Sequence, residues 1–148
     1  MKGNLLLVDD EPLILKNLKF NLEDYAENIF TAENGLIALD VLAEQNIQCV
    51  VCDINMPKMN GVEVIKAIRE KGNNVPFIFY TAHGNHELMM EVAQYGAFDF
   101  LNKPDLTGLE DSVIKGLKEG VSREQGSASS EAIKPGEVED ILLSLDED

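Results

Sequence analysis

Short apolar runs alternate along the first 121 residues with segments whose apolar residues recur every three or four positions. Runs of four or five mostly apolar residues suit strands buried in a parallel sheet. The predicted strands are residues 4–8, 29–32, 49–53, 77–81 and 98–102. The first and third carry the most continuous apolar runs, so we expect them at the centre of the sheet and the second and fifth at its edges.

The segments between and after these strands have helical spacing. Pro12 suits the first turn of a helix. The apolar positions at helical spacing are Leu15, Leu18 and Leu22; Leu39 and Leu42; Val64, Ile65 and Ile68; Leu88, Met89, Val92 and Ala93; and Leu109, Val113 and Leu117, before an expected helix end near Gly120. Five strands alternating with five helices predict an α/β fold, a (βα)5 doubly wound parallel sheet. The pattern is compatible with the flavodoxin-like strand order 2-1-3-4-5.

Composition limits the functional classes. A chain of 148 residues suits one domain, here residues 1–121. The net charge of −15 disfavours direct nucleic-acid binding, which needs cations to neutralise phosphates. No apolar run approaches the roughly 20 residues of a membrane span. Two cysteines, and a start that does not read as a signal peptide, lead us to expect a cytoplasmic protein.

Polar side chains follow four of the predicted strands. Asp9 and Asp10 end the first, Asp53 the third, Thr81 the fourth and Lys103 the fifth. With the predicted topology, all would lie on one edge of the sheet, where α/β proteins form their crevice. Clustered carboxylates repel one another unless a cation compensates, and oxygen ligands suit Mg²⁺ or Mn²⁺. Helix capping or solvation would explain each residue singly, but not the shared edge.

With these residues identified, the chain resembles the receiver domain of two-component response regulators. The matching motifs are residues 7–12, 53–61, 80–82 and 100–104, within a resemblance that spans residues 3–121. The resemblance implies that a histidine kinase or phosphotransfer protein phosphorylates Asp53. It also implies that Asp10, Asp53 and the backbone carbonyl of Asn55 bind Mg²⁺ (or Mn²⁺), with Asp9 acting mostly through water.

The resemblance assigns further roles. Lys103 and Thr81 would hold the phosphoryl oxygens, and the Lys103–Pro104 peptide bond would be cis. Thr81 and Phe100 would form a switch that changes a surface made by the fourth helix, fifth strand and fifth helix for a downstream protein target. Asn55 and His83 resemble positions that tune the lifetime of the acyl phosphate. We expect a phosphoacceptor rather than an enzyme with a dedicated substrate, and a phosphorylation-dependent homodimer stays open.

Two other patterns suggest metal binding only weakly. Cys49 and Cys52 are three residues apart on a strand, so their side chains point to opposite faces of the sheet and cannot easily share a metal or form a disulfide. His83 and His86 lie in a loop region without a sulfur or carboxylate partner nearby in sequence, so solvated side chains are expected.

The last 27 residues differ in composition from the rest. Residues 122–137 have the small and polar composition of a flexible linker. Residues 138–148 are acidic and contain an apolar set at helical spacing: Val138, Ile141, Leu142 and Leu145. This tail is either disordered or a short amphipathic helix that docks on its own domain or on a partner.

Three alternative functions stay open at this stage. A phosphorylation-independent scaffold would have the same fold. A haloacid-dehalogenase-type phosphatase also forms an aspartyl phosphate, but it needs a second acid two residues after the nucleophile, where this chain has Asn55. A flavodoxin-like carrier would have to bind a flavin phosphate beside Asp9, Asp10 and Glu11, which would repel it.

Overall fold

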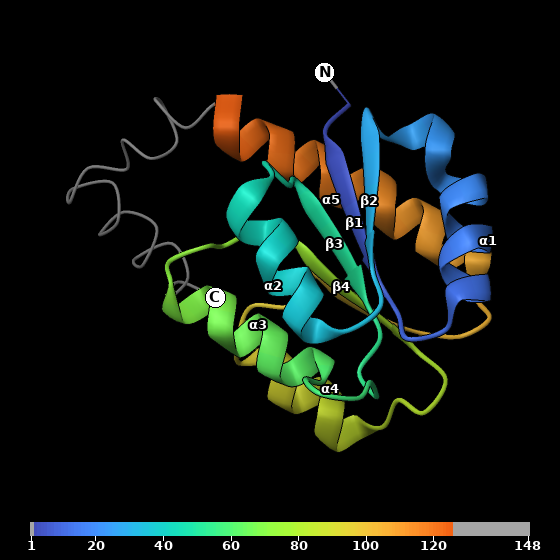
Figure 1. Cartoon of the computed structure of the whole chain (residues 1–148), viewed down its shortest axis with the longest axis vertical. Helices are drawn as coiled ribbons and strands as arrows, with labels where there is room; N and C mark the ends of the chain where they lie inside the picture. Colours follow the sequence, from blue (N-terminus) through green and yellow to red (C-terminus); the bar gives the residue numbers. More distant parts are fainter. Residues whose placement is uncertain (1, 126–148) are drawn as a thin grey trace, which may run out of the picture.

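A single parallel sheet forms the centre of the molecule, and its topology confirms the predicted α/β class. The computed structural model describes residues 2–125. The sheet has the order β2-β1-β3-β4-β5, and every neighbouring pair is parallel (Figure 1). The strands are β1 (Asn4–Val8), β2 (Asn28–Ala32), β3 (Cys49–Cys52), β4 (Phe77–Thr81) and β5 (Asp99–Asn102).

Helices cover both faces of this sheet. They are α1 (Pro12–Leu22), α2 (Gly35–Glu44), α3 (Gly61–Glu70), α4 (His86–Ala93) and α5 (Leu106–Gln125), with a short 3-10 turn at Glu23–Tyr25 that the sequence did not predict. Helices α1 and α5 pack on one face, and α2, α3 and α4 lie on the other (Figure 1). This three-layer arrangement buries both faces of the central strands.

Successive residues of each central strand point to opposite hydrophobic cores. In β3, Val50 and Cys52 belong to the core beneath α2, α3 and α4, whereas Cys49 and Val51 belong to the core beneath α1 and α5. Both cysteines are free and buried. The prediction that Cys49 and Cys52 face opposite sides of the sheet is therefore confirmed.

Three helices begin with an asparagine whose side chain caps the first turn. The side-chain oxygens of Asn34, Asn60 and Asn85 accept hydrogen bonds from backbone N–H groups three residues later, each at 2.9 Å. Such caps satisfy N–H groups that have no partner inside the helix. These local signals fix the starts of α2, α3 and α4, and thereby the lengths of the loops that precede them.

Helix α5 is longer than the sequence suggested. It continues past Gly120 to Gln125, so it includes the first residues of the predicted linker at 122–137. Side-chain contacts support the extra turn: Arg123 bonds to Glu119 and to the carbonyl of Asn74, and Glu124 accepts from Gln48. The rest of the linker and the tail at 138–148 lie outside the described residues. Among residues 2–125, no helix is long and apolar enough to cross a membrane.

Candidate functional site

The carboxyl ends of four parallel strands bring the predicted polar residues to one edge of the sheet. Asp9 follows β1, Asp53 follows β3, Thr81 ends β4 and Lys103 follows β5. Backbone hydrogen bonds hold these ends in register: Asp53 N–H donates to the Val8 carbonyl, and Lys103 N–H to the Thr81 carbonyl, both at 2.9 Å. The sheet itself therefore positions the side chains.

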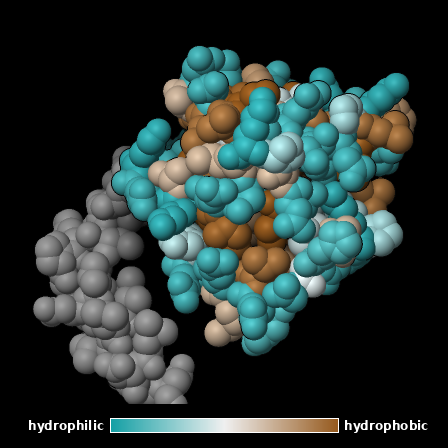
Figure 2. All heavy atoms as spheres, turned by 60° about the horizontal axis from the view of Figure 1, so that its bottom comes forward, coloured by the Kyte–Doolittle hydropathy of each residue, from teal (hydrophilic) through white to brown (hydrophobic). Residues whose placement is uncertain are grey.

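Three carboxylates meet at this edge. Asp9, Asp10 and Asp53 each place one oxygen within 4.8 Å of the others. Asp9 and Asp53 are buried, at 2% and 8% exposure, whereas Asp10 is exposed. Figure 2 turns this end of the molecule forward and shows hydrophilic side chains around a hydrophobic patch. The cluster thus combines two buried acids with one that opens to solvent.

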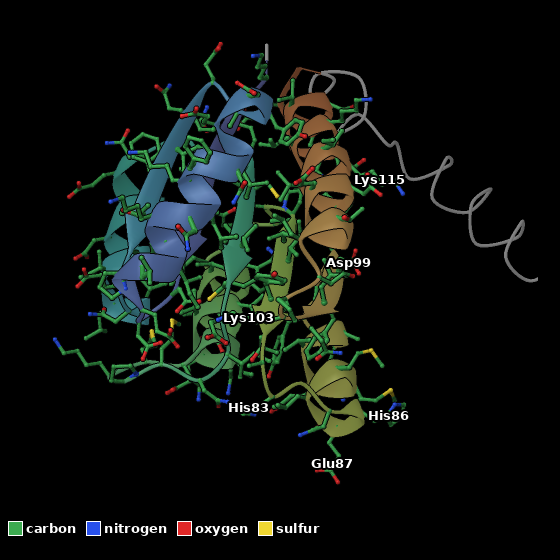
Figure 3. All side chains as sticks on the ribbon, turned by 90° about the vertical axis from the view of Figure 1, so that its right-hand side faces the viewer. His83, His86, Glu87, Asp99, Lys103 and Lys115 are labelled. Carbon is green, nitrogen blue, oxygen red and sulfur yellow. The ribbon has the colours of Figure 1, made fainter. Side chains whose placement is uncertain are left out.

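Lys103 reaches into the carboxylate cluster from β5. Its Nζ lies 2.7 Å from Asp9 Oδ2 and 3.0 Å from Asp53 Oδ2, and only 12% of its side chain is exposed. Figure 3 shows Lys103 among the carboxyl ends of the strands. The family resemblance assigned Lys103 to phosphoryl oxygens alone, and its double pairing with Asp9 and Asp53 was not predicted. The signal was present, since all three residues follow strands that end on the same edge.

Burial and pairing oppose each other at Asp9 and Lys103. Burial raises the pKa of Asp9 above its ordinary value, although the hydrogen bond from Lys103 acts in the other direction. Burial disfavours the charged form of Lys103, but hydrogen bonds to Asp9 and Asp53 outweigh it and raise the pKa of Lys103. The lysine is therefore held protonated, whereas burial makes ionisation of Asp9 less favourable than in water and Lys103 offsets part of that effect.

The donor set fits a hard divalent cation. One lysine charge faces three carboxylates, so negative charge is left in excess. Carboxylate oxygens with one side open to solvent suit Mg²⁺, which prefers oxygen ligands and keeps several waters. Asp10 would supply an exposed oxygen and Asp53 a buried one. Asn55 lies two residues after Asp53 and is exposed, on the same loop.

The backbone after Asp53 is tightly arranged. The Ile54 N–H donates to Asp53 Oδ1 at 2.7 Å, which orients the carboxylate and leaves Oδ2 to Lys103. A Cβ on Gly61 would collide with the Asp53 carbonyl oxygen, so only glycine fits at the start of α3. Lys58, between them, has a positive φ of 69°, a conformation that is uncommon for a residue with a side chain. The amino-acid composition of this loop does not indicate that its backbone is constrained at Lys58 and Gly61.

The predicted switch residues also lie near this edge. Thr81 is buried at 1% exposure, and its Oγ1 is 3.5 Å from the His83 N–H. Phe100 is half-buried, with its ring centroid 6.2 Å from that of Phe79. A Cβ on Gly84 would touch the Phe100 ring at 2.5 Å, so the loop after β4 packs directly on this aromatic side chain. Thr81 and Phe100 are therefore connected through the segment 82–84.

Other predicted positions have simpler surroundings. The Lys103–Pro104 peptide bond is cis. His83 and His86 are exposed, and Figure 3 shows both toward the lower end of the molecule. The acidic cluster is the one group of three metal-ligating side chains found among residues 2–125, and it contains neither histidine.

Comparison with known proteins identifies the family. The family model described as "Response regulator receiver domain" matches residues 5–114. The chain belongs to the response regulator receiver family. Sporulation initiation phosphotransferase F of Bacillus subtilis is 35% identical to this receiver over 120 residues, covering 79% of this chain and 95% of the relative. The transcriptional regulatory protein FixJ of Bradyrhizobium diazoefficiens is 30% identical, covering 89% of this chain and 63% of its own.

Solved structures agree with this assignment. The receiver domain of a putative Luxo repressor protein from Vibrio parahaemolyticus matches with a TM-score of 0.79 and 29% identity, over 84% of this chain and 97% of that one. The chemotaxis protein CheY4 of Vibrio cholerae matches with a TM-score of 0.68 and 28% identity, over 78% and 96%. This receiver spans less than two thirds of the length of several curated relatives, including FixJ and the Escherichia coli regulator GlrR, of which it covers 23%.

Proposed function

We propose that Asp53 accepts a phosphoryl group from the phosphohistidine of a histidine kinase or phosphotransfer protein. The observation that carries this proposal is the pairing of Asp53 Oδ2 with Lys103 at 3.0 Å inside a cluster of three carboxylates. Asp53 is the member of that cluster at the centre of the sheet edge. Its Oδ1 is fixed by the Ile54 N–H, so the carboxylate is already oriented before a donor arrives.

The transfer step is a substitution at phosphorus. An Asp53 carboxylate oxygen forms the new bond, the P–N bond to the donor imidazole breaks, and the imidazole leaves with the electron pair. Such reactions depend mainly on positioning and on stabilising negative charge. Lys103 binds phosphoryl oxygen as an ammonium donor, and the Thr81 hydroxyl donates a second hydrogen bond from the neighbouring strand end.

Asp10, Asp53 and the Asn55 carbonyl would hold a divalent cation, Mg²⁺ or Mn²⁺, at the acidic cluster. When bound, this ion offsets the negative charge of the carboxylates and of the incoming phosphoryl group. Asp9 adds negative charge behind the residues that bind the ion directly. It also positions Lys103, whose Nζ lies 2.7 Å from Asp9 Oδ2. In this role the chain is a phosphoacceptor that assists its own phosphorylation and dephosphorylation, without a dedicated substrate.

Two surfaces suit the partners of such a switch. Helix α1 starts beside the acids and exposes Leu13 and Phe20, at 69% and 74%, which suits a phosphoryl donor protein approaching Asp53. On the other side, α4, β5 and α5 form an edge on which Figure 3 shows His86, Glu87, Asp99 and Lys115. Movement of Thr81 toward the phosphoryl group, followed by Phe100, would change this edge for a downstream protein target.

Intact-mass spectrometry tests the phosphoacceptor directly. With Mg²⁺ and acetyl phosphate, the wild-type chain should gain the mass of one phosphoryl group, whereas Asp53→Asn should gain none. Asp40→Asn, which alters an exposed acid on α2, is the matched control and should behave as wild type. If neither acetyl phosphate nor beryllofluoride modifies or binds the wild type, the receiver acts as a scaffold and the proposal fails.

A further inference from the structure

A second concave region lies at the opposite edge of the sheet, where the strands begin. It has a volume of about 1020 Å³ and is bounded by the segments that lead into β3, β4 and β5 and by the end of α5. Ile47, Val75, Pro76 and Tyr95 give it apolar walls, and asparagine and glutamine side chains border them. The proposed phosphoryl-transfer chemistry uses none of these residues. We call this region the amino-end pocket.

Both arginines of the chain line the amino-end pocket. They are Arg69 from α3 and Arg123 from α5, 54 positions apart in the sequence. Arg69 donates to the carbonyls of Tyr95, Asn73 and Gly96. These contacts fix the guanidinium but do not neutralise it. Among residues 2–125, no carboxylate lies within ion-pair distance of Arg69.

The charged side chains around the pocket are unevenly paired. Burial lowers the pKa of Arg69 to about 10, and the nearby charge of Arg123 adds to this effect. The two guanidinium groups therefore repel each other. Glu119 pairs with Arg123 at 3.0 Å, and Glu124 is occupied by the amides of Gln48 and Asn46. Amide donors leave the charge of Glu124 in place, so two arginines and two glutamates lie around the pocket; Arg69 is nevertheless left without an ion-pair partner among residues 2–125 and can pair with an acidic ligand.

The sequence supplies one such ligand within reach. Residues 138–148 carry the apolar set of Val138, Ile141, Leu142 and Leu145 together with five acids and no basic residue. Helix α5 brings the chain to the rim of the pocket. Glu124 lines the pocket, and Gln125 is the last residue of the helix that the structure describes. Twelve further residues, 126–137, can span roughly 40 Å at full extension. A short tether of this kind gives a high effective concentration of the tail at the pocket.

We propose that residues 138–148 dock into the amino-end pocket of their own receiver, with apolar side chains against Val75, Pro76 and Tyr95 and acidic side chains toward Arg69 and Arg123. Apolar burial supplies most of the attraction, and the charges set the orientation. The docked tail would cover the end of α5 and the segment between α4 and β5. It would leave the carboxylate edge around Asp53 open, so docking does not depend on phosphorylation.

A spin label on the tail tests this proposal in the full chain. Ser144→Cys provides one reactive thiol, because Cys49 and Cys52 are both fully buried and burial raises the pKa of each thiol. In ¹⁵N spectra, a nitroxide at residue 144 should broaden the amide signals of Asn74, Tyr95 and Gly96. Those of Asp10 and Gly84, at the opposite edge, should stay sharp. Uniform broadening, or broadening confined to α4 and β5, would overturn the proposal.

Two substitutions and one control separate docking from simple proximity. Leu142 lies outside residues 2–125, which form the receiver described above, so Leu142→Asp should leave the receiver intact while abolishing the selective broadening. Arg123→Gln should reduce it by about threefold or less, because a half-exposed charge contributes little, whereas Lys118→Gln on the same helix should not change it. Unaltered broadening in Leu142→Asp would refute docking through the apolar set.

Mixing experiments identify the copy that is bound. A ¹⁴N chain that carries the nitroxide is added to a ¹⁵N chain that carries none. The ¹⁵N signals should show no broadening, because each tail binds its own receiver. Selective broadening in the mixture would show that the tail binds a second copy and would overturn the intramolecular assignment. This test does not depend on Asp53 chemistry, so its failure is distinguishable from failure of the proposed phosphoacceptor function.

Discussion

The two edges of the sheet handle charge in opposite ways. At the carboxyl edge, one lysine faces three carboxylates, and two of these acids are buried. At the amino edge, two arginines lie together and bond chiefly to backbone carbonyls. Negative charge is in excess at the first edge, whereas at the second edge Arg69 has no ion-pair partner among residues 2–125, although the same strands and helices connect them.

This difference follows from what each charge is bonded to. Buried ions that are bonded to one another depend strongly on their partners, since removal of one leaves the other unpaired. Charges that are half-exposed and bonded to neutral carbonyls lose less when they are removed. The carboxyl edge should therefore be sensitive to single substitutions in its stability, whereas the amino edge should be sensitive mainly in what it binds.

Lys103→Met should give the largest loss of stability. It keeps much of the apolar stem but leaves Asp9 and Asp53 without their buried partner, so we expect the free energy of unfolding to fall by about 3 kcal/mol. Urea denaturation measures this change. Mg²⁺ should restore part of the loss, because a divalent cation can replace the missing positive charge. The exposed Lys118→Met is the control, with an expected change within about 0.5 kcal/mol.

The pH dependence of that loss gives a second test. The pKa of Lys103 is raised above 10.5 because the hydrogen bonds to Asp9 and Asp53 outweigh the opposing effect of burial. A raised pKa in the folded state means that the stabilisation is complete below the unfolded value and is lost as pH rises through the folded value. The difference between wild type and Lys103→Met should thus be constant from neutral pH and shrink above 10.5. A difference that grows in this range would contradict the pairing.

Asp10→Asn should separate ion binding from folding. Asp10 is exposed, so its loss should change the free energy of unfolding by no more than about 0.5 kcal/mol. Mg²⁺ at ten times its dissociation constant should stabilise wild type by about 1.4 kcal/mol. At the same concentration, the variant should gain less than half of this. Asp40→Asn is the control acid, and equal Mg²⁺ stabilisation in wild type and Asp10→Asn would exclude Asp10 as a ligand.

The sequence predicted the fold well because the burial of a strand determines both its apolar pattern and its place in the strand order. Strands buried on both faces read as continuous apolar runs, and such runs at β1 and β3 marked the centre of the sheet. The acids and Lys103 were also found from sequence, since they directly follow strands that must end on one edge. The opposite faces of Cys49 and Cys52 followed from the geometry of a strand alone.

Other features depend on contacts between distant residues. The pairing of Lys103 with Asp9 and Asp53 requires side chains from three strands, and the sequence gives only their common edge. The continuation of α5 past Gly120 is supported by contacts with Gln48 and Asn74, which lie in other segments. The amino-end pocket brings together Arg69 and Arg123 from two helices, and no local pattern in the sequence indicates that they meet.

Arg123→Gln should cause the smallest loss of stability. The Arg123 side chain is 46% exposed and forms an i, i+4 pair with Glu119 at 3.0 Å, a kind of pair that contributes about 0.5 kcal/mol. Measurement in the Leu142→Asp background removes any contribution from a docked tail. In urea denaturation, the loss should be several times smaller than that of Lys103→Met, and added salt should reduce it further by screening. A loss as large as that of Lys103→Met would mean that the arginines hold the amino edge together. The two edges would then not differ in the dependence of folding on their charges, and Arg123 would have to be assigned to the core structure rather than to binding.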